Sequence, residues 1–230
     1  MTTPAYTRHF WAKSDRDNKQ RIHLLEHHMA DVGACLEALL AQPTIRRRLA
    51  RSGGGGDPGE ANSARLCVFA ALHDIGKVNV GFQTRIWDVE DLPTGGRIPA
   101  TGHIADLAPV LYKRDRQTAK WLLKALQWNE IEKWDDKEGE TVRSLFLASL
   151  SHHGRPFQLN DPAKDKNTRV WQPLGQLEPQ RFVEHAGQLI RHWFPQAFRH
   201  DACPLPSAPS FQHHFLGLCN LADWIGSNES

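Results

Sequence analysis

The sequence lacks any apolar run long enough to cross a membrane, since a spanning helix needs about 20 consecutive apolar residues. Its first residues, Met1 to Gln20, are polar and charged and do not resemble a signal peptide. We therefore expect a cytoplasmic protein with no membrane partner. The four cysteines form no C-x-x-C pair and lie mostly in apolar helical contexts, which favours a reducing compartment.

An excess of charge of either sign is also missing. The 230 residues include 28 Lys and Arg against 26 Asp and Glu, a formal net charge of +2. Such a chain has no broad positive field for coating nucleic acid, so any contact with a polyanion must be local. Basic clusters at Arg46 to Arg51 and at Lys113 to Lys124 are typical of solvated helix faces. The chain has no G-x-x-x-x-G-K-[ST] phosphate loop, which excludes an ATP-driven motor that uses this loop.

Hydrophobic spacing predicts a mostly helical chain. Apolar residues recur about every three or four positions, and no stretch alternates convincingly between apolar and polar residues. We predict an all-α helical bundle with long irregular loops, forming a single domain over residues 1–230. The predicted helices cover residues 22–40, 64–74, 109–128, 141–153, 180–194 and 211–225. The predicted loops cover residues 51–63, 82–101 and 160–179, which are rich in Gly, Pro or polar residues.

The most informative segment is Leu72 to Lys77, with the sequence Leu-His-Asp-Ile-Gly-Lys, at the end of an apolar predicted helix. On consecutive helical residues, an imidazole and a carboxylate point about 100° apart, so His73 and Asp74 can grip a metal from two sides. The second oxygen of Asp74 then remains for another ion. A single His-Asp pair arises easily by chance, and a histidine on an apolar helix is more often a hydrogen-bonded core residue.

The number of histidines changes this balance. The chain has 13 histidines, with doublets at His27-His28, His152-His153 and His213-His214. Burying many imidazoles without partners costs hydrogen-bonding free energy, which a shared metal centre avoids. Candidate ligands recur at the ends or inner faces of separate predicted helices. They are His28, His73, Asp74, His103, His152, His153 and Asp223.

Ligands from five distant segments suit a helical core that converges on one site, as in bundles that assemble dinuclear centres. Zinc fingers instead use closely spaced Cys and His pairs, which this chain lacks. The other histidines, including His27 and His185, are assigned no ligand role.

These segments resemble the HD phosphohydrolase superfamily and, within it, the HD nuclease domain of the type I CRISPR helicase-nuclease. The stretches that carry the resemblance are Trp11 to Ser14, His23 to Val32, His73 to Lys77 with Phe82-Gln83, Ser151 to Gly154, and Leu221 to Trp224. Each motif alone is weak, but their occurrence together in this order is highly specific. The register of the first-helix motif selects His28 rather than His27.

The resemblance implies a dinuclear metal site. One ion would take His28, His73, Asp74 and Asp223, and the other Asp74, His103, His152 and His153. Asp74 would be the catalytic bridge, and Lys77 would contact a metal-bound phosphate; the alternative for Lys77 is a solvated surface lysine. Two ions about 3.5 to 4 Å apart can lower the pKa of a bound water and stabilise in-line displacement at phosphorus. Imidazole-rich shells favour Mn, Fe, Co or Ni over Mg, and Zn is possible.

The function implied is a metal-dependent nuclease that cuts single-stranded DNA in CRISPR interference. Its expected partners are single-stranded DNA, a Cascade-type surveillance complex, and a helicase module in cis or in trans. The chain would be a stand-alone subunit or the N-terminal part of a longer helicase-nuclease. Trp11 or Trp87 is a candidate for stacking on a base.

Two alternatives remain open. An HD enzyme acting on deoxynucleotides or cyclic dinucleotides needs a closed base pocket, whereas a nuclease needs an open groove. A docking module without catalysis is the other alternative, and the competent residues at all seven ligand positions argue against it.

Overall fold

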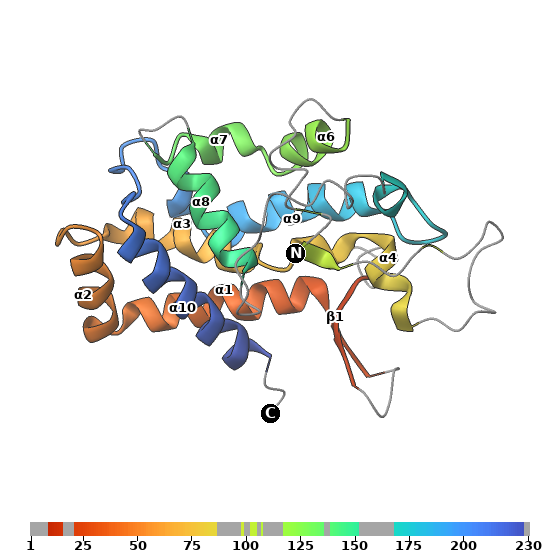
Figure 1. The fold of residues 1–230 in the computed structure, drawn as a ribbon, viewed down its shortest axis with the longest axis horizontal. Coiled ribbons are helices and arrows are strands. Elements are labelled where there is room, and N and C mark those ends of the chain that lie inside the picture. The colour runs from red at the N-terminus through yellow and green to blue at the C-terminus, as the bar shows by residue number, and fades with distance from the viewer. Residues whose placement is uncertain are drawn as a thin grey trace. The chain divides into compact units, whose positions relative to one another are not determined.

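The computed structural model describes residues 9–15, 21–86, 98, 102–104, 107, 117–135, 139–151 and 168–227. Over these residues the fold is all-α apart from one two-stranded sheet (Figure 1). The α-helices are α1 (Leu25–Ala41), α2 (Pro43–Ser52), α3 (Gly59–Ala71), α4 (Val80–Gln83), α6 (Gln117–Ala125), α7 (Trp128–Glu132), α8 (Glu140–Leu150), α9 (Pro179–Trp193) and α10 (Pro209–Gly226). Short 3-10 helices are η2 (Ile75–Val78), η3 (Thr84–Ile86), η6 (Thr168–Trp171) and η7 (Pro195–Phe198). Among the described helices, none combines the length and apolar character that crossing a membrane requires.

Proline marks the start of three helices. α2, α9 and α10 begin at Pro43, Pro179 and Pro209, in the first turn, where a backbone N–H has no helical partner to lose. The last two helices begin and end within two residues of the predicted ranges 180–194 and 211–225, and these predictions are confirmed.

The chain before α1 forms a strand. β1 (Trp11–Ser14) and β2 (Ile22–Leu24) pair antiparallel, with Ser14 opposite Ile22. The helix predicted from residue 22 therefore begins three residues too early. A short apolar run fits a strand as well as a helical turn, and here the partner strand decides between them.

Several further boundaries differ from the prediction: α8 ends at Leu150, the loop predicted over residues 82–101 begins inside α4 and η3, and η6 lies in the loop predicted over residues 160–179. α2 continues to Ser52 and α3 begins at Gly59, so the loop predicted over residues 51–63 shrinks to 53–58. Gln127 adopts a left-handed conformation with φ of 52° between α6 and α7. This residue interrupts the helix predicted over residues 109–128, of which residues 109–116 lie outside the described part.

Residue contacts divide the chain into two compact units, each with its own apolar core. The first unit comprises Met1–His27, Asp74–Leu126 and Phe157–Gly187. The second unit comprises His28–His73, Gln127–Pro156 and Gln188–Ser230.

In the second unit, α3, α8 and α10 pack around the fully buried Phe69 of α3. Its ring lies 6.0 Å from that of Phe146 on α8 and 6.3 Å from that of Phe215 on α10. α10 buries Phe211, Phe215, Cys219 and Ala222, which recur at helical spacing along one side. Burying each large apolar side chain stabilises the fold by roughly 2 kcal/mol. This packing fixes the rotation of α10, and with it the direction in which Asp223 points.

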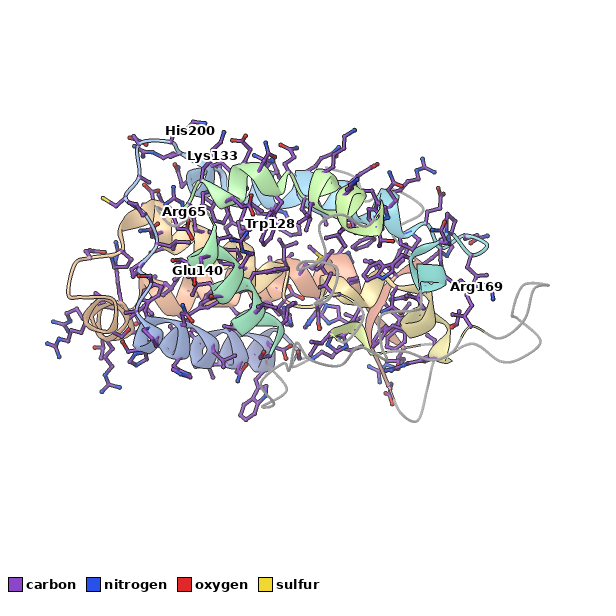
Figure 2. All side chains as sticks on the ribbon, turned by 45° about the horizontal axis from the view of Figure 1, so that its top comes forward. Arg65, Trp128, Lys133, Glu140, Arg169 and His200 are labelled. Atoms are coloured by element: carbon purple, nitrogen blue, oxygen red, sulfur yellow. The ribbon has the colours of Figure 1, made fainter. Side chains whose placement is uncertain are left out.

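A buried cation orders the irregular segment before α10. Arg65, labelled in Figure 2, lies on α3 and is 2% exposed. Its guanidinium donates to the main-chain oxygens of Ala197, Arg199 and Cys203 and to the side chain of Asn62, at 2.8 to 3.1 Å. Burial lowers the pKa of Arg65. Arginine supplies five donors in a rigid fork, which lets one side chain bind several carbonyl groups at once.

In the first unit, Trp11 of β1 and Gln83 of α4 are joined by reciprocal hydrogen bonds. The amide of Trp11 and its indole N–H donate to Oε1 and the main-chain oxygen of Gln83, both at 2.9 Å. Gln83 Nε2 donates to the main-chain oxygens of Trp11 and Lys77, at 2.9 and 2.7 Å. Trp11 is 7% exposed and stacks against Phe82, with ring centroids 4.6 Å apart. The suggestion that Trp11 stacks on a base is therefore wrong.

Candidate metal centre

His73 and Asp74 lie in a turn between two helices. α3 ends at Ala71 and η2 begins at Ile75, and Asp74 has φ of −107° and ψ of 10°. The helix predicted over residues 64–74 is therefore wrong in its last three residues. The separation of about 100° between consecutive helical side chains does not apply to this pair.

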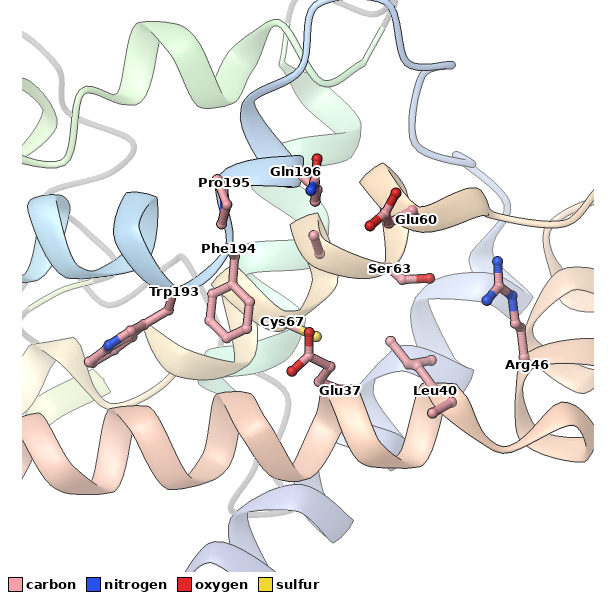
Figure 3. A pocket seen from close by; sticks show the side chains of 12 residues that line it. Glu37, Leu40, Arg46, Glu60, Ser63, Cys67, Trp193, Phe194, Pro195 and Gln196 are labelled. Carbon is pink, nitrogen blue, oxygen red and sulfur yellow. The ribbon is translucent and has the colours of Figure 1, made fainter.

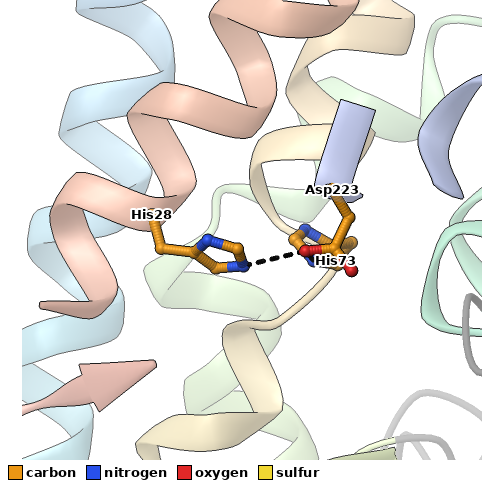
Figure 4. Close-up of side chains that lie close together, drawn as sticks. All are labelled: His28, His73 and Asp223. Carbon is orange, nitrogen blue, oxygen red and sulfur yellow. Dashed lines mark ion pairs between the residues drawn. The ribbon is translucent and has the colours of Figure 1, made fainter. Parts of the chain in front are cut away.

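Three of the predicted ligands converge in the second unit (Figure 4). They are His28 on α1, His73 after α3 and Asp223 in the last turns of α10, and all three are buried. One ligand atom of each lies within 4.8 Å of the others. Asp223 Oδ1 lies 3.4 Å from His28 Nε2 and 3.7 Å from His73 Nε2.

The ring of His73 is held by its own chain. Nδ1 lies 2.7 Å from the main-chain oxygen of Ala70. A carbonyl oxygen only accepts hydrogen bonds, so Nδ1 carries the proton and Nε2 carries the lone pair. Metal-binding histidines use the same arrangement, in which a bond to one nitrogen orients the other toward the ion. His73 is thus preset as an Nε2 ligand.

Ser227 orients the carboxylate of Asp223. Its hydroxyl lies 2.9 Å from Asp223 Oδ1 and 2.5 Å from the main-chain oxygen of Asp223. Sequence reasoning did not find this contact. The signal was available, because residues four positions apart meet on one side of a helix.

A second cluster of predicted site residues lies in the first unit. Asp74 is 1% exposed, and its Oδ2 lies 2.5 Å from Lys77 Nζ while its Oδ1 lies 3.2 Å from His103 Nε2. Lys77 Nζ also donates to the main-chain oxygen of Ala12 at 3.0 Å. Lys77 is 5% exposed, so the alternative of a solvated surface lysine is wrong. Its contact with a bound phosphate stays a prediction.

Gly76 allows the chain around His103 to approach the turn. A Cβ atom on Gly76 would lie 2.0 Å from the main-chain oxygen of His103, closer than any real contact. The glycine in the His-Asp-Ile-Gly-Lys motif is therefore needed for space. With any larger residue at position 76, the chain around His103 would have to move away from the turn.

The remaining predicted ligands, His152 and His153, lie outside the described residues, as does Trp87. Of the histidines given no ligand role, His27 is exposed next to the fully buried His28, in agreement with the predicted register. His185 differs from the expectation. It is 7% exposed, and its Nε2 lies 3.2 Å from Glu26 Oε2, a pair that sequence reasoning missed because its members stand 159 positions apart.

A separate cavity of about 210 Å³ lies in the second unit, between α1, α3 and the segment from Trp193 to Gln196 (Figure 3). None of the predicted ligands lines it. Burial raises the pKa of the Cys67 thiol in its wall, and the carboxylate of Glu37 raises it further. A raised pKa disfavours the thiolate, which is the form that acts as a nucleophile. The cavity is also smaller than the roughly 300 Å³ at which small-molecule sites begin.

The donor atoms of His28, His73 and Asp223 suit a transition metal. Two imidazole nitrogens and a carboxylate oxygen are the ligands that Zn, Mn, Fe, Co and Ni accept in proteins. Their burial and their mutual distances within 4.8 Å allow one ion to reach all three atoms. The residues present therefore fit a bound divalent cation.

The sequence profile described as "Cas3, HD domain" matches residues 11–230. The chain belongs to the Cas3 HD domain family. This family comprises CRISPR-associated, metal-dependent HD nucleases. A comparison of the sequence with curated proteins finds no match.

Solved structures of Cas3 share the fold. The chain aligns with T. fusca Cas3 bound to ATP at 22% identity and a TM-score of 0.60, over 96% of this chain and 23% of that one. It aligns with the Thermus thermophilus Cas3 HD domain, solved in the presence of Ni²⁺, at 23% identity and a TM-score of 0.55, over 97% of this chain and 78% of that one. A chain of a CRISPR RNA-guided surveillance complex in a pre-nicking state aligns at 22% identity and a TM-score of 0.55. The alignment covers 96% of this chain and 24% of that one. The chain thus spans about a quarter of the T. fusca protein.

Proposed function

We propose that this chain is a metal-dependent phosphodiesterase that cleaves single-stranded DNA in CRISPR interference. The observation that carries the proposal is the convergence of His28, His73 and Asp223 in a chain that matches the Cas3 HD domain over residues 11–230. Three buried donors this close together have a clear role once a cation joins them.

The ligand sets follow the two clusters. His28, His73 and Asp223 would hold one divalent ion, joined by Asp74, which follows His73 directly in the chain. Asp74 and His103 would hold a second ion together with His152 and His153. Bound ions supply an activated water and offset the charge that builds up on the phosphodiester. The Thermus thermophilus HD domain was solved in the presence of Ni²⁺, which supports a transition metal here, with Mn, Fe and Co as further candidates and Zn possible.

The chain's own residues set the geometry around the ions. The carbonyl of Ala70 accepts a hydrogen bond from His73 Nδ1, which leaves Nε2 of the neutral ring to bind an ion. Ser227 fixes the rotation of the Asp223 carboxylate. Lys77 holds Asp74 Oδ2, and its buried ammonium adds a positive charge beside the bridging carboxylate, where it can offset negative charge on a phosphate.

The partners are proposed from the similarity to solved structures of Cas3. T. fusca Cas3 was solved with ATP, and a similar chain was solved in a surveillance complex. We infer that this chain works in the cytoplasm with an ATP-using helicase module, in cis or in trans, and with a Cascade-type complex.

A substrate panel tests the reaction. The purified chain, first stripped with EDTA, is given Mn²⁺ or Ni²⁺ and either circular single-stranded DNA, deoxynucleoside triphosphates or cyclic dinucleotides. We expect cleavage of the circular DNA and no turnover of the small nucleotides. A circle is a suitable substrate because an endonuclease needs no free end. Turnover of the small nucleotides alone would transfer the activity to the nucleotide-directed HD enzymes.

Two variants assign the activity to the site. Asp223→Asn removes a charged ligand with little change in shape, and His27→Gln changes the exposed neighbour of a ligand. DNA cleavage should disappear in the first variant and persist in the second. Equal cleavage by Asp223→Asn and the parent would place the nuclease in a contaminant and favour a docking role for this chain.

A further inference from the structure

The ring of Phe82 contacts both cations of the segment that follows Asp74. From Ile75 to Ile86 the charged residues are Lys77 and Arg85. Lys77 Nζ lies 5.5 Å from the centre of the ring, and the guanidinium carbon of Arg85 lies 4.9 Å from it, both within the range of cation–π contacts. The segment contains no carboxylate, so its own charged side chains are all positive.

The same ring contacts a member of the Asp74 cluster. Phe82 and His103 meet edge to face, with ring centroids 5.7 Å apart and an interplanar angle of 82°. His103 Nε2 lies 3.2 Å from Asp74 Oδ1. The guanidinium of Arg85 and the imidazole of His103 are therefore neighbours of one ring, which places Arg85 close to the cluster that would hold the second ion.

Hydrogen bonds fix the position of Phe82. Asn79 is fully buried and caps α4, because its Oδ1 accepts a bond from the main-chain N–H of Phe82 at 2.7 Å. Its Nδ2 donates to the main-chain oxygen of Gly76, also at 2.7 Å. Asn79 thus ties the helix that carries Phe82 to the segment directly after Asp74. A ring held in this way gives the guanidinium that packs on it a defined place.

Arg85 and Lys77 differ in what they can reach. Lys77 is 5% exposed, and its ammonium is bound to Asp74 Oδ2 and to the main-chain oxygen of Ala12. Arg85 is exposed, on η3. A guanidinium that stacks on a ring keeps its N–H donors in its own plane, where they can bind two oxygens of one phosphate. Of the two cations, Arg85 is the one that an anion arriving from solvent can contact.

We propose that Arg85 binds a phosphate of the single-stranded substrate, next to the phosphodiester held at the Asp74 cluster. This inference rests on the proposed function and adds to it a residue that binds the strand. Phe82 is the positioning residue, since its ring keeps the guanidinium near His103. The lack of carboxylates from Ile75 to Ile86 favours an anion at this place.

Cleavage kinetics test the contact. Arg85→Gln should raise KM for circular single-stranded DNA with Mn²⁺ about tenfold, the effect of losing one charge-assisted hydrogen bond. The same variant should keep kcat within about twofold of the parent, because a flanking phosphate carries its charge throughout the reaction and its contact stabilises bound strand and transition state alike. Arg85→Lys keeps the charge without the planar fork and should give an intermediate KM.

Binding in EDTA measures the charge without cleavage. Fluorescence anisotropy of a labelled oligothymidylate of about 15 nucleotides, near the upper site size of single-strand binding folds, gives the dissociation constant. Arg85→Gln should weaken binding and lower the slope of log K against log salt by about 0.7, the contribution of one phosphate contact on a single strand. Arg85→Lys should keep the slope of the parent.

Two exposed cations outside this segment serve as matched controls. Arg181 of the first unit pairs with Glu178 at 2.8 Å, and Lys133 of the second unit pairs with Glu130 at 2.9 Å. Arg181→Gln and Lys133→Gln should both show the KM and the salt slope of the parent.

Titration with Mn²⁺ separates a substrate contact from a structural role. Arg85→Gln should bind Mn²⁺ like the parent, because Phe82 and His103 keep their contacts with each other. Weaker Mn²⁺ binding with an unchanged KM would make Arg85 a support for Phe82 and would overturn the proposal. An unchanged dissociation constant and salt slope in Arg85→Gln would also overturn it. A parent that binds the oligonucleotide but does not cut DNA would contradict the proposed function alone, since the binding assay contains no metal.

Discussion

Two buried clusters in this chain are made from the same kinds of residue but hold their carboxylates differently. In the second unit, Asp223 faces two imidazole nitrogens at 3.4 and 3.7 Å and the hydroxyl of Ser227. In the first unit, Asp74 faces the ammonium of Lys77 at 2.5 Å and the imidazole of His103 at 3.2 Å.

The difference matters because an imidazole can share an ion with a carboxylate, whereas an ammonium has three donors and no acceptor and competes with the ion. The cluster around Asp223 is therefore ready to take a metal directly. The cluster around Asp74 already contains its own cation and has to accommodate an ion beside it. We expect the ion at His28, His73 and Asp223 to bind more tightly than the ion at Asp74 and His103.

The largest effect should come from removing a ligand of the tighter cluster. His28→Ala should abolish the tight Mn²⁺ site and lower DNA cleavage by more than about 100-fold, beyond the usual cost of losing an outer-shell partner. Isothermal titration of the EDTA-stripped protein measures the site. The matched control is His27→Ala, at the exposed neighbouring position, which should titrate like the parent. Retention of the tight site in His28→Ala would contradict the assigned ligand set.

Removing the internal cation tests the other cluster. Lys77→Met leaves the buried carboxylate of Asp74 without its ammonium, which typically costs about 3 kcal/mol of folding stability. We expect a lower Tm in EDTA, and Mn²⁺ should raise the Tm of this variant more than that of the parent, since a metal can replace the lost charge. Thermal melts with and without Mn²⁺ measure both. Lys133→Met, at an exposed pair, should melt like the parent. An equal response of variant and parent to Mn²⁺ would show that no ion reaches Asp74.

Adding one methyl group at Gly76 should affect metal binding at the Asp74 cluster but not at the Asp223 cluster. Gly76→Ala places a Cβ atom on the main-chain oxygen of His103 and should cost about 2 kcal/mol, as overpacking does in cores. The weaker of two Mn²⁺ binding events should be lost while the tighter one remains. Titration with Mn²⁺ measures both events. If the tight event disappeared instead, the order of affinities inferred above would be reversed.

The smallest effect should come from Ser227. Ser227→Ala removes the hydroxyl that orients Asp223 and should weaken the tight Mn²⁺ site about tenfold, at the low end for outer-shell partners. Ser227→Thr keeps the hydroxyl and should restore the affinity. The same titration measures both variants. Equal affinity in the parent and Ser227→Ala would reduce this hydrogen bond to a feature of the helix end.

Local signals in the sequence sufficed for some elements. Pro179 and Pro209 mark the starts of α9 and α10, and the apolar spacing within each helix does the rest, because both signals act over a few residues. The same logic failed for Ile22–Leu24, where strand pairing with β1 outweighs an apolar spacing that also fits a helix. It failed again at His73 and Asp74, because nothing in the apolar run shows that α3 stops at Ala71.

Motif order identified the candidate ligands better than it described their surroundings. The residue pattern predicts His28, His73 and Asp223 as ligands, the resemblance selects His28 over His27, and the structure brings the three together. The contact of Lys77 with the main-chain oxygen of Ala12 and the pairing of His185 with Glu26 depend on tertiary packing between distant segments. The exposure of Trp224 depends on which side of α10 its neighbours bury. A local pattern contains none of this.

The segment from Ala197 to Cys203 has almost no regular structure after η7, yet its main-chain oxygens are bound by one guanidinium from α3. Arg65 here takes the place of a neighbouring strand, which would otherwise supply those donors. The conformation of this segment therefore depends on a side chain of α3. On heating, the segment should lose its structure together with α3 and no earlier, so an apparently loose connection shares the melting temperature of the core.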